Sequence, residues 1–160
     1  MARRDGEDAL VVRQEFRASA EFLFDAWTDP ALLARWFHAR PSWSTRVVRC
    51  DVRVGGGWEI VMVPPPGEGP DCRCFGAYRA IERPRRLVFT WHANGEDDYE
   101  TIVTLEFRAL GPDRTELVLT QTGLRAPEDR EDHRRGWDGC LASLAGLVDE
   151  AVDEPKKGRT

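Results

Sequence analysis

The side chains best suited to chemistry in this sequence are four cysteines, and their spacing does not favour a metal site. Cys72 and Cys74 are two residues apart, so on a strand they would face the same side. Structural zinc sites usually draw on knuckles with two to four residues between the cysteines, and no second close pair is present. Cys50 and Cys140 could join them only through the tertiary fold. We therefore predict no metal ligand, and four reduced thiols on partly buried elements.

The run Gly55–Gly57 raises the question of a phosphate-binding loop. Such a loop needs a strand before it and a helix N-terminus after it, so that backbone N–H groups and the helix dipole converge on the anion. Here the sequence WEIVM at 58–62 follows, which is typical of a strand, and no lysine-serine or lysine-threonine signature is present. The glycines therefore predict a tight turn between two strands of a bending sheet.

Catalytic patterns find little support elsewhere. No Ser-His-Asp set can be read from spacing, and the G-x-S-x-G motif is missing. The carboxylates Glu59, Glu100 and Glu106 alternate with apolar residues, which predicts that they face solvent. We predict no catalytic residue and no cofactor.

Composition limits the class of protein. A length of 160 residues is near that of one domain, and 41% hydrophobic with 32% charged residues is typical of a globular protein. A net charge of −5 argues against nucleic acid as the main partner. We find no secretory signal and no apolar run of the roughly 18 residues that would span a bilayer, so we expect a cytoplasmic protein without membrane insertion.

The first forty residues predict a strand and two short helices. Over residues 9–18 the mostly apolar positions alternate with the more polar ones at a period of two, which indicates a half-buried strand. Ser19 is placed to cap a helix that follows, and Asp29 with Pro30 begins a second one that ends near Phe37.

The rest of the chain predicts a sheet and one long helix. Residues 44–123 contain six apolar runs separated by short polar or glycine-proline turns, which is typical of an antiparallel meander. From Pro127 apolar residues recur at steps of three and four, which predicts a long amphipathic helix. We expect a single domain over 9–153, with tails at 1–8 and 154–160.

One helix cannot cover both faces of a seven-stranded sheet, so the sheet must curl around it. A sheet that grips a helix in this way tends to leave a concave apolar space, the usual form of a ligand site. The sequence thus predicts an α+β fold with a cavity between the sheet and the C-terminal helix.

Five segments carry a resemblance to a known family: FDAWTDPALLARWF, DVRVGGGWEI, GAYRAIERPRRLVFTW, TELVLTQTGL and HRRGWDGCLASL. In order and spacing they resemble the bacterial relatives of the Hsp90-ATPase-activator C-terminal domain, within the START-like, helix-grip superfamily. The resemblance covers about residues 10 to 150 and implies the helix-grip fold with a pocket between sheet and long helix. The superfamily includes lipid carriers, hormone receptors and polyketide cyclases. The family often has glycine at the position of His38, near the expected mouth of the pocket.

We therefore expect binding of a hydrophobic small molecule that is lipid-like, aromatic or polyketide-like. Two residues have a second interpretation: Gln121 could face solvent, and His133 could tie the helix to a loop. The tryptophans could equally fill the core. The candidate ligand-binding residues are Trp36, Phe37, Trp58, Ile60, Met62, Phe89, Trp91, Leu119, Gln121, His133, Trp137 and Leu141.

Two alternatives to simple binding remain open at this point. A cyclase- or hydrolase-type enzyme on the same scaffold would need two titratable groups that converge inside the cavity. A chaperone-associated interaction module is the other alternative. It is not favoured, because the eukaryotic activator pairs this domain with a second one and 160 residues leave no room for it. A homodimer is also left open.

Overall fold

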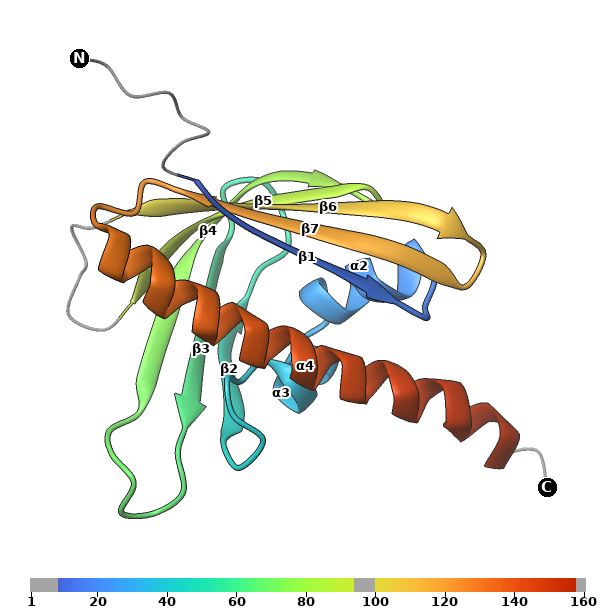
Figure 1. Ribbon diagram of the computed structural model, residues 1–160, viewed down its shortest axis with the longest axis horizontal. Coiled ribbons are helices and arrows are strands. Elements are labelled where there is room, and N and C mark those ends of the chain that lie inside the picture. Colours follow the sequence, from blue (N-terminus) through green and yellow to red (C-terminus); the bar gives the residue numbers. More distant parts are fainter. Residues whose placement is uncertain (1–8, 94–99, 158–160) are drawn as a thin grey trace.

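The computed structural model describes residues 9–93 and 100–157 and shows one curved sheet wrapped around a long helix (Figure 1). The chain order confirms the predicted sequence of a strand, two short helices, six strands and a long helix. The elements are β1 (Leu10–Phe16), α2 (Ala20–Thr28), α3 (Pro30–Trp36), β2 (Ser44–Cys50), β3 (Gly57–Val63), β4 (Cys72–Glu82), β5 (Arg86–Ala93), β6 (Thr101–Gly111), β7 (Arg114–Thr122) and α4 (Pro127–Lys157).

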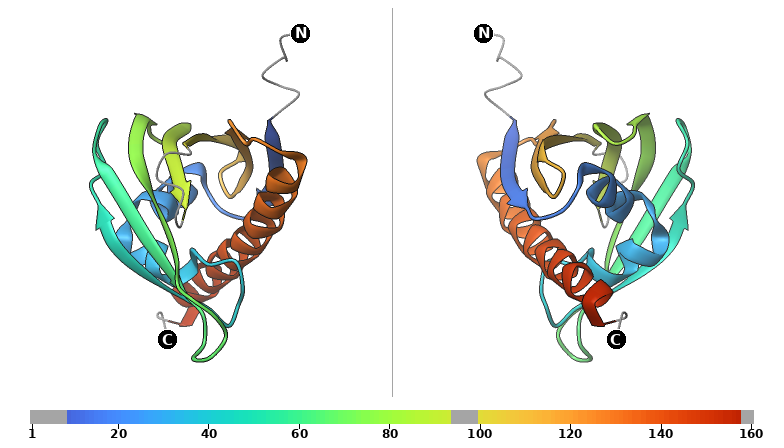
Figure 2. Two further views of the ribbon diagram at one scale, coloured as in Figure 1. Left: turned by 90° about the vertical axis from the view of Figure 1, so that its left-hand side faces the viewer. Right: turned by 90° about the vertical axis from the view of Figure 1, so that its right-hand side faces the viewer.

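The seven strands form one antiparallel sheet in the order β1-β7-β6-β5-β4-β3-β2. β1 and β2 therefore occupy opposite edges, and the chain crosses between them through α2 and α3. Figure 2 shows the sheet curving around α4, with α2 and α3 inside the concave side. This is the predicted helix-grip architecture, and the fold class is confirmed.

The two short helices begin at the predicted caps. The side chain of Ser19 accepts a hydrogen bond from the backbone N–H of Phe22 at 3.1 Å, and Asp29 accepts one from Ala31 at 2.9 Å. Each cap satisfies a backbone donor that the first helical turn leaves unpaired. Pro30 occupies the start of α3, where its missing N–H is not needed.

The limits of the domain differ slightly from expectation at one end. α4 continues to Lys157, so residues 154–157, which we expected to form part of a C-terminal tail, prolong the helix. The expected N-terminal tail, residues 1–8, lies outside the described residues.

The glycine run forms the turn between β2 and β3. Gly55 has a φ of +86°, a backbone conformation that glycine adopts without steric cost. A Cβ atom at Gly56 would collide with the carbonyl oxygen of Asp51. The turn also pairs with β4, because the Gly55 N–H donates to the Tyr78 carbonyl at 2.8 Å and the Tyr78 N–H donates to Gly56 at 2.9 Å. The predicted turn between strands is confirmed.

The concave side of the sheet holds the core. The buried face of α4, from Trp137 to Val148, packs there together with the buried residues of α2 and α3. Tryptophan and phenylalanine rings meet at centroid distances of about 5 to 6 Å, in the tilted and edge-on arrangements that aromatic pairs prefer.

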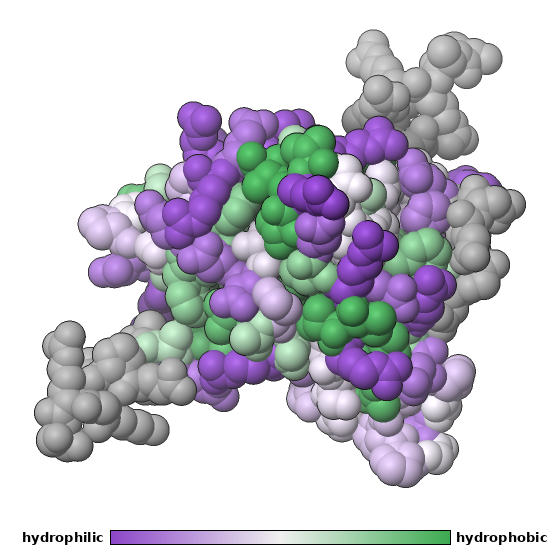
Figure 3. Space-filling view, turned by 180° about the vertical axis from the view of Figure 1, so that it is seen from behind, coloured by the Kyte–Doolittle hydropathy of each residue, from purple (hydrophilic) through white to green (hydrophobic). Residues whose placement is uncertain are grey.

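On the side of the molecule turned away from α4, the described residues form no broad apolar face. Figure 3 shows that apolar side chains there form small patches between charged ones.

Candidate ligand-binding site

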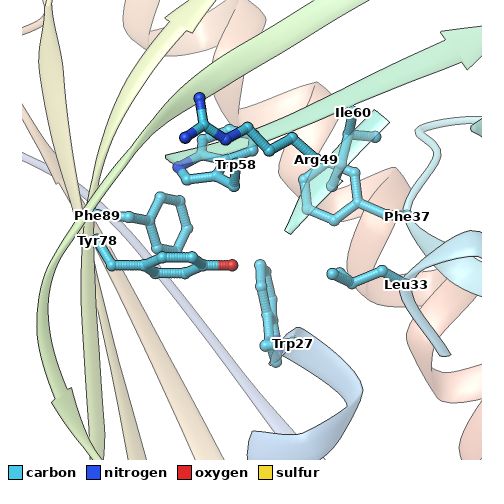
Figure 4. A pocket seen from close by; sticks show the side chains of 8 residues that line it. All are labelled: Trp27, Leu33, Phe37, Arg49, Trp58, Ile60, Tyr78 and Phe89. Carbon is cyan, nitrogen blue, oxygen red and sulfur yellow. The ribbon is translucent and has the colours of Figure 1, made fainter. Parts of the chain in front are cut away.

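A space lined by the side chains labelled in Figure 4 lies between the sheet and the two short helices. We call it the inner cavity, and its volume is about 20 Å³. That is room for little more than one water molecule, which needs roughly 10 to 15 Å³ measured in the same way. The inner cavity in this conformation therefore holds no organic ligand. Its lining residues are Trp27, Leu33, Phe37, Arg49, Trp58, Ile60, Tyr78 and Phe89.

A second space lies at the open end of the grip, and we call it the outer cleft. It has a volume of about 260 Å³ and lies between β3, β4 and β5 on one side and the first turns of α4 on the other. The segment between α3 and β2 forms a third wall. The residues that line the outer cleft are Ala39, Trp43, Met62, Cys72, Cys74, Trp91, Ala93, Asp132, His133, Gly136, Trp137 and Cys140.

The size of the outer cleft restricts the ligand. A dry apolar cavity of about 150 Å³ binds benzene, and pockets for drug-sized molecules begin near 300 Å³. At about 260 Å³ the outer cleft has room for a molecule of one or two rings.

The structure divides the predicted site residues into three groups. Four line the inner cavity: Phe37, Trp58, Ile60 and Phe89. Four line the outer cleft: Met62, Trp91, His133 and Trp137. The other four line neither space and lie fully buried in the core: Trp36, Leu119, Gln121 and Leu141.

Trp91 stands between the two spaces. Its ring centroid lies 5.5 Å from that of Trp58, which lines the inner cavity, and 4.9 Å from that of Trp137, which lines the outer cleft. The indole N–H of Trp91 is buried and has no hydrogen-bond partner among the described residues. The indole N–H groups of Trp27 and Trp58 are in the same state, and a buried donor without a partner costs about 1 to 3 kcal/mol.

Gln121 positions Trp137 instead of facing solvent, so the solvent-facing interpretation of Gln121 is wrong. The Trp137 indole N–H donates to the Gln121 side-chain oxygen at 2.8 Å, and the Gln121 amide donates to Thr101 Oγ1 at 2.9 Å. All three side chains are buried. This chain of hydrogen bonds fixes one wall of the outer cleft from behind.

His133 lines the outer cleft from α4. Its Nδ1 lies 2.8 Å from the carbonyl oxygen of Asp129, one turn earlier in the same helix. Because a carbonyl oxygen only accepts, Nδ1 carries the proton and Nε2 of the neutral ring is an acceptor. His38 lies elsewhere: it contacts Thr45, lines neither space, and burial lowers its pKa.

Three thiols line the outer cleft, and their environments differ. A hydrogen bond with Cys74 lowers the pKa of Cys72 to about 7, although partial burial opposes this shift. The same hydrogen bond, together with burial, raises the pKa of Cys74. Burial raises the pKa of Cys140 to about 12. Cys50 lies outside the outer cleft, and burial raises its pKa as well.

Sequence reasoning missed these thiols as lining residues, although their period-two spacing placed both Cys72 and Cys74 on one strand face. It also missed Ala39 and Trp43, which belong to the segment between α3 and β2. That segment has no periodic pattern, so nothing in the sequence indicated which of its side chains turns inward.

Comparison with protein families gives one match that spans most of the chain. Residues 17–149 match the family described as Activator of Hsp90 ATPase homolog 1-like protein. None of the curated proteins compared with the chain matches it. No helix within 9–93 or 100–157 is long and apolar enough to cross a membrane.

Solved structures of similar proteins share the fold. An AHSA1 protein from Silicibacter pomeroyi is 26% identical, with a TM-score of 0.77 over 89% of this chain and 99% of that one. A protein from Chromobacterium violaceum is 25% identical, with a TM-score of 0.75 over 88% and 96%. An HSP90 activator from Plasmodium falciparum, 23% identical with a TM-score of 0.69 over 88% and 96%, is similar in fold alone.

Proposed function

The chain belongs to the Activator of Hsp90 ATPase homolog 1-like family, and from this premise we propose that it binds a small apolar molecule in the outer cleft. The observation that carries the proposal is the open space of about 260 Å³ lined by apolar and sulfur-bearing side chains, beside an inner cavity that is almost full. Ligand sites in proteins are mostly concave and apolar with a few polar groups.

The chemistry of the walls narrows the ligand class. Trp43, Trp91 and Trp137 offer aromatic surface, which suits a planar ring system. The ligand that fits best is therefore an aromatic molecule of one or two rings, of which 1-indanone is an example. A lipid-like ligand, which the sequence also allows, would extend beyond this space into solvent.

The expected affinity is moderate. Burial of about 200 Å² of apolar ligand surface would contribute on the order of 5 kcal/mol before the costs of association. This corresponds to a dissociation constant on the order of 100 μM or weaker.

Binding can be tested with 1-indanone, a two-ring ketone, by quenching of tryptophan fluorescence and by a thermal-shift assay. Gly136 lines the outer cleft, and a Cβ atom there would meet no heavy atom within 4 Å. The variant Gly136→Leu should therefore fill the outer cleft and weaken binding at least tenfold without loss of thermal stability.

Gly146→Leu is the matched control, because Gly146 lies on the same helix, also has open space around its Cβ position, and does not line the outer cleft. It should bind 1-indanone as the parent protein does. Equal affinities in the two variants, or no binding by the parent protein at millimolar 1-indanone, would overturn the proposal.

A further inference from the structure

We infer that Cys72 is a nucleophile that captures apolar α,β-unsaturated carbonyl compounds covalently in the outer cleft. The inference rests on the proposed function and names a narrower ligand class for the same site. The observation behind it is the presence of three thiols on the walls of one apolar space, with Cys72 alone of the three only half-buried.

The fold sets the thiols at different depths. Cys72 begins β4, opposite Met62 at the end of β3, whereas Cys74 lies further along β4, paired with Ala93 of β5. Residues two apart on a strand face the same side, so both sulfur atoms point into the grip. Cys72 is thus the thiol at the rim, and Cys74, with 1% of its surface exposed, lies beneath it.

Cys74 activates Cys72. The thiolate is the reactive form of cysteine, and a thiolate that accepts a hydrogen bond is stabilised relative to the thiol. With its pKa lowered to about 7 by the bond from Cys74, about half of Cys72 is ionised at neutral pH. Cys50 and Cys140 remain protonated there, because burial raises the pKa of each.

The walls of the outer cleft would orient the electrophile. The rings of Trp91 and Trp137 hold the apolar part of the molecule beside Cys72.

The reaction balances without any further reagent. The Cys72 sulfur donates an electron pair to the β-carbon and forms a C–S bond. The π-bond between the α- and β-carbons breaks, and its electron pair passes into the enolate. The proton that the thiol lost to solvent is replaced by a proton from solvent on the α-carbon, so the product is a saturated thioether.

A metal site is a weaker interpretation of the same thiols. Among the described residues, no group of three or more His, Cys, Asp or Glu side chains is arranged to hold a metal ion.

The test uses 4-phenyl-3-buten-2-one, a one-ring enone, and acrylamide, a small polar electrophile, followed by intact-mass spectrometry and peptide mapping. Each rate is divided by the rate of the same reagent with glutathione, which corrects for intrinsic reactivity. We expect one adduct, on Cys72, whose rate saturates with enone concentration. The corrected rate for the enone should exceed that for acrylamide at least tenfold.

Variants separate capture from ordinary thiol chemistry. Cys72→Ser should abolish the adduct, and Cys50→Ser, which removes the other half-buried thiol, should leave it unchanged. Cys74→Ala removes the activating hydrogen bond, so the midpoint of the rate against pH should rise from about 7 toward the ordinary range of a thiol.

The other ionisable groups of the outer cleft must be considered before the midpoint of the rate against pH is assigned to Cys72. These are Cys74 on β4 and Asp132, His133 and Cys140 on α4. A midpoint that stays at about 7 in Cys74→Ala would assign the titration to another of these groups and would refute the role of Cys74.

Absence of an adduct, first modification at Cys50, or equal corrected rates for the two reagents would overturn the inference. Binding of 1-indanone, which has no electrophilic alkene, to Cys72→Ser distinguishes the two proposals. If Cys72→Ser binds 1-indanone and the parent protein forms no enone adduct, capture fails and the proposed function stands.

Discussion

Gly139 should be the one glycine of α4 whose replacement by alanine destabilises the protein. α4 has glycines at positions 136, 139 and 146, and alanine at any of them gains about 1 kcal/mol of helix propensity. Only at Gly139 would the new Cβ collide with another segment. It would lie 2.0 Å from the carbonyl oxygen of Ala39 and 2.9 Å from the carbonyl carbon, whereas Cβ atoms at Gly136 and Gly146 would meet nothing within 4 Å.

The size of the effect follows from this geometry. Backbone atoms cannot rotate away as a flexible side chain can, so α4 and the segment that carries Ala39 must separate by about 1 Å to restore van der Waals distance. Overpacking of this kind costs typically about 1 to 3 kcal/mol. The same junction holds a hydrogen bond from Ser143 Oγ to the His38 carbonyl at 3.1 Å, which the separation would stretch.

The comparison of two variants isolates the collision, because the gain in helix propensity is common to both. We expect Gly139→Ala to be about 2 kcal/mol less stable than Gly146→Ala, which corresponds to a melting temperature lower by about 4 to 8 °C. Urea denaturation followed by circular dichroism measures the free energy of unfolding, and unchanged m-values would show that the variants unfold to a similar state.

A second readout links this prediction to the site. Ala39 lines the outer cleft, so its displacement should also weaken binding of 1-indanone in Gly139→Ala and not in Gly146→Ala. Equal unfolding free energies for Gly139→Ala and Gly146→Ala would refute the reasoning, because they would mean that α4 and the Ala39 segment are not held at the distance described.

Two further substitutions test the polar contacts that position the core. Gln121→Leu leaves the buried Trp137 N–H without an acceptor, so we expect a loss of about 1 to 3 kcal/mol in urea denaturation together with a changed tryptophan emission; an unchanged stability would contradict the role of that hydrogen bond. Ser19→Ala removes the cap of α2 and should cost about 1 kcal/mol, whereas Ser19→Asp should retain most of the stability; equal losses in both would count against capping.

The order and type of the elements could be predicted because their signals are local. Ser19 and Asp29 begin helices through hydrogen bonds to residues two or three positions away, and the structure contains both bonds. The Gly55–Gly57 run lies between two strands, and its positive φ at Gly55 needs no distant partner. Alternation in strands and periodicity in helices are likewise properties of single elements. They predicted seven strands and one long helix, and from this set of elements we expected a sheet that curls around the last helix.

The position of the site depended on contacts that no local pattern encodes. Trp58 on β3 and Trp91 on β5 lie on the same face of the sheet with β4 between them, yet Trp58 lines the inner cavity and Trp91 the outer cleft. Gln121 was expected at a ligand or in solvent and instead holds Trp137 from within the core. Each of these positions depends on which side chains of other elements pack against the residue, and a local sequence pattern does not determine that.

The sequence by itself determined the family, the helix-grip fold and the apolar character of the space that the fold encloses. Only the tertiary structure decided how much of that space stays open, and where. A cavity is the small difference between the volume that sheet and helices enclose and the volume that their side chains fill, so it changes with every packing contact. That difference is about 20 Å³ at the centre of this protein and about 260 Å³ beside Cys72.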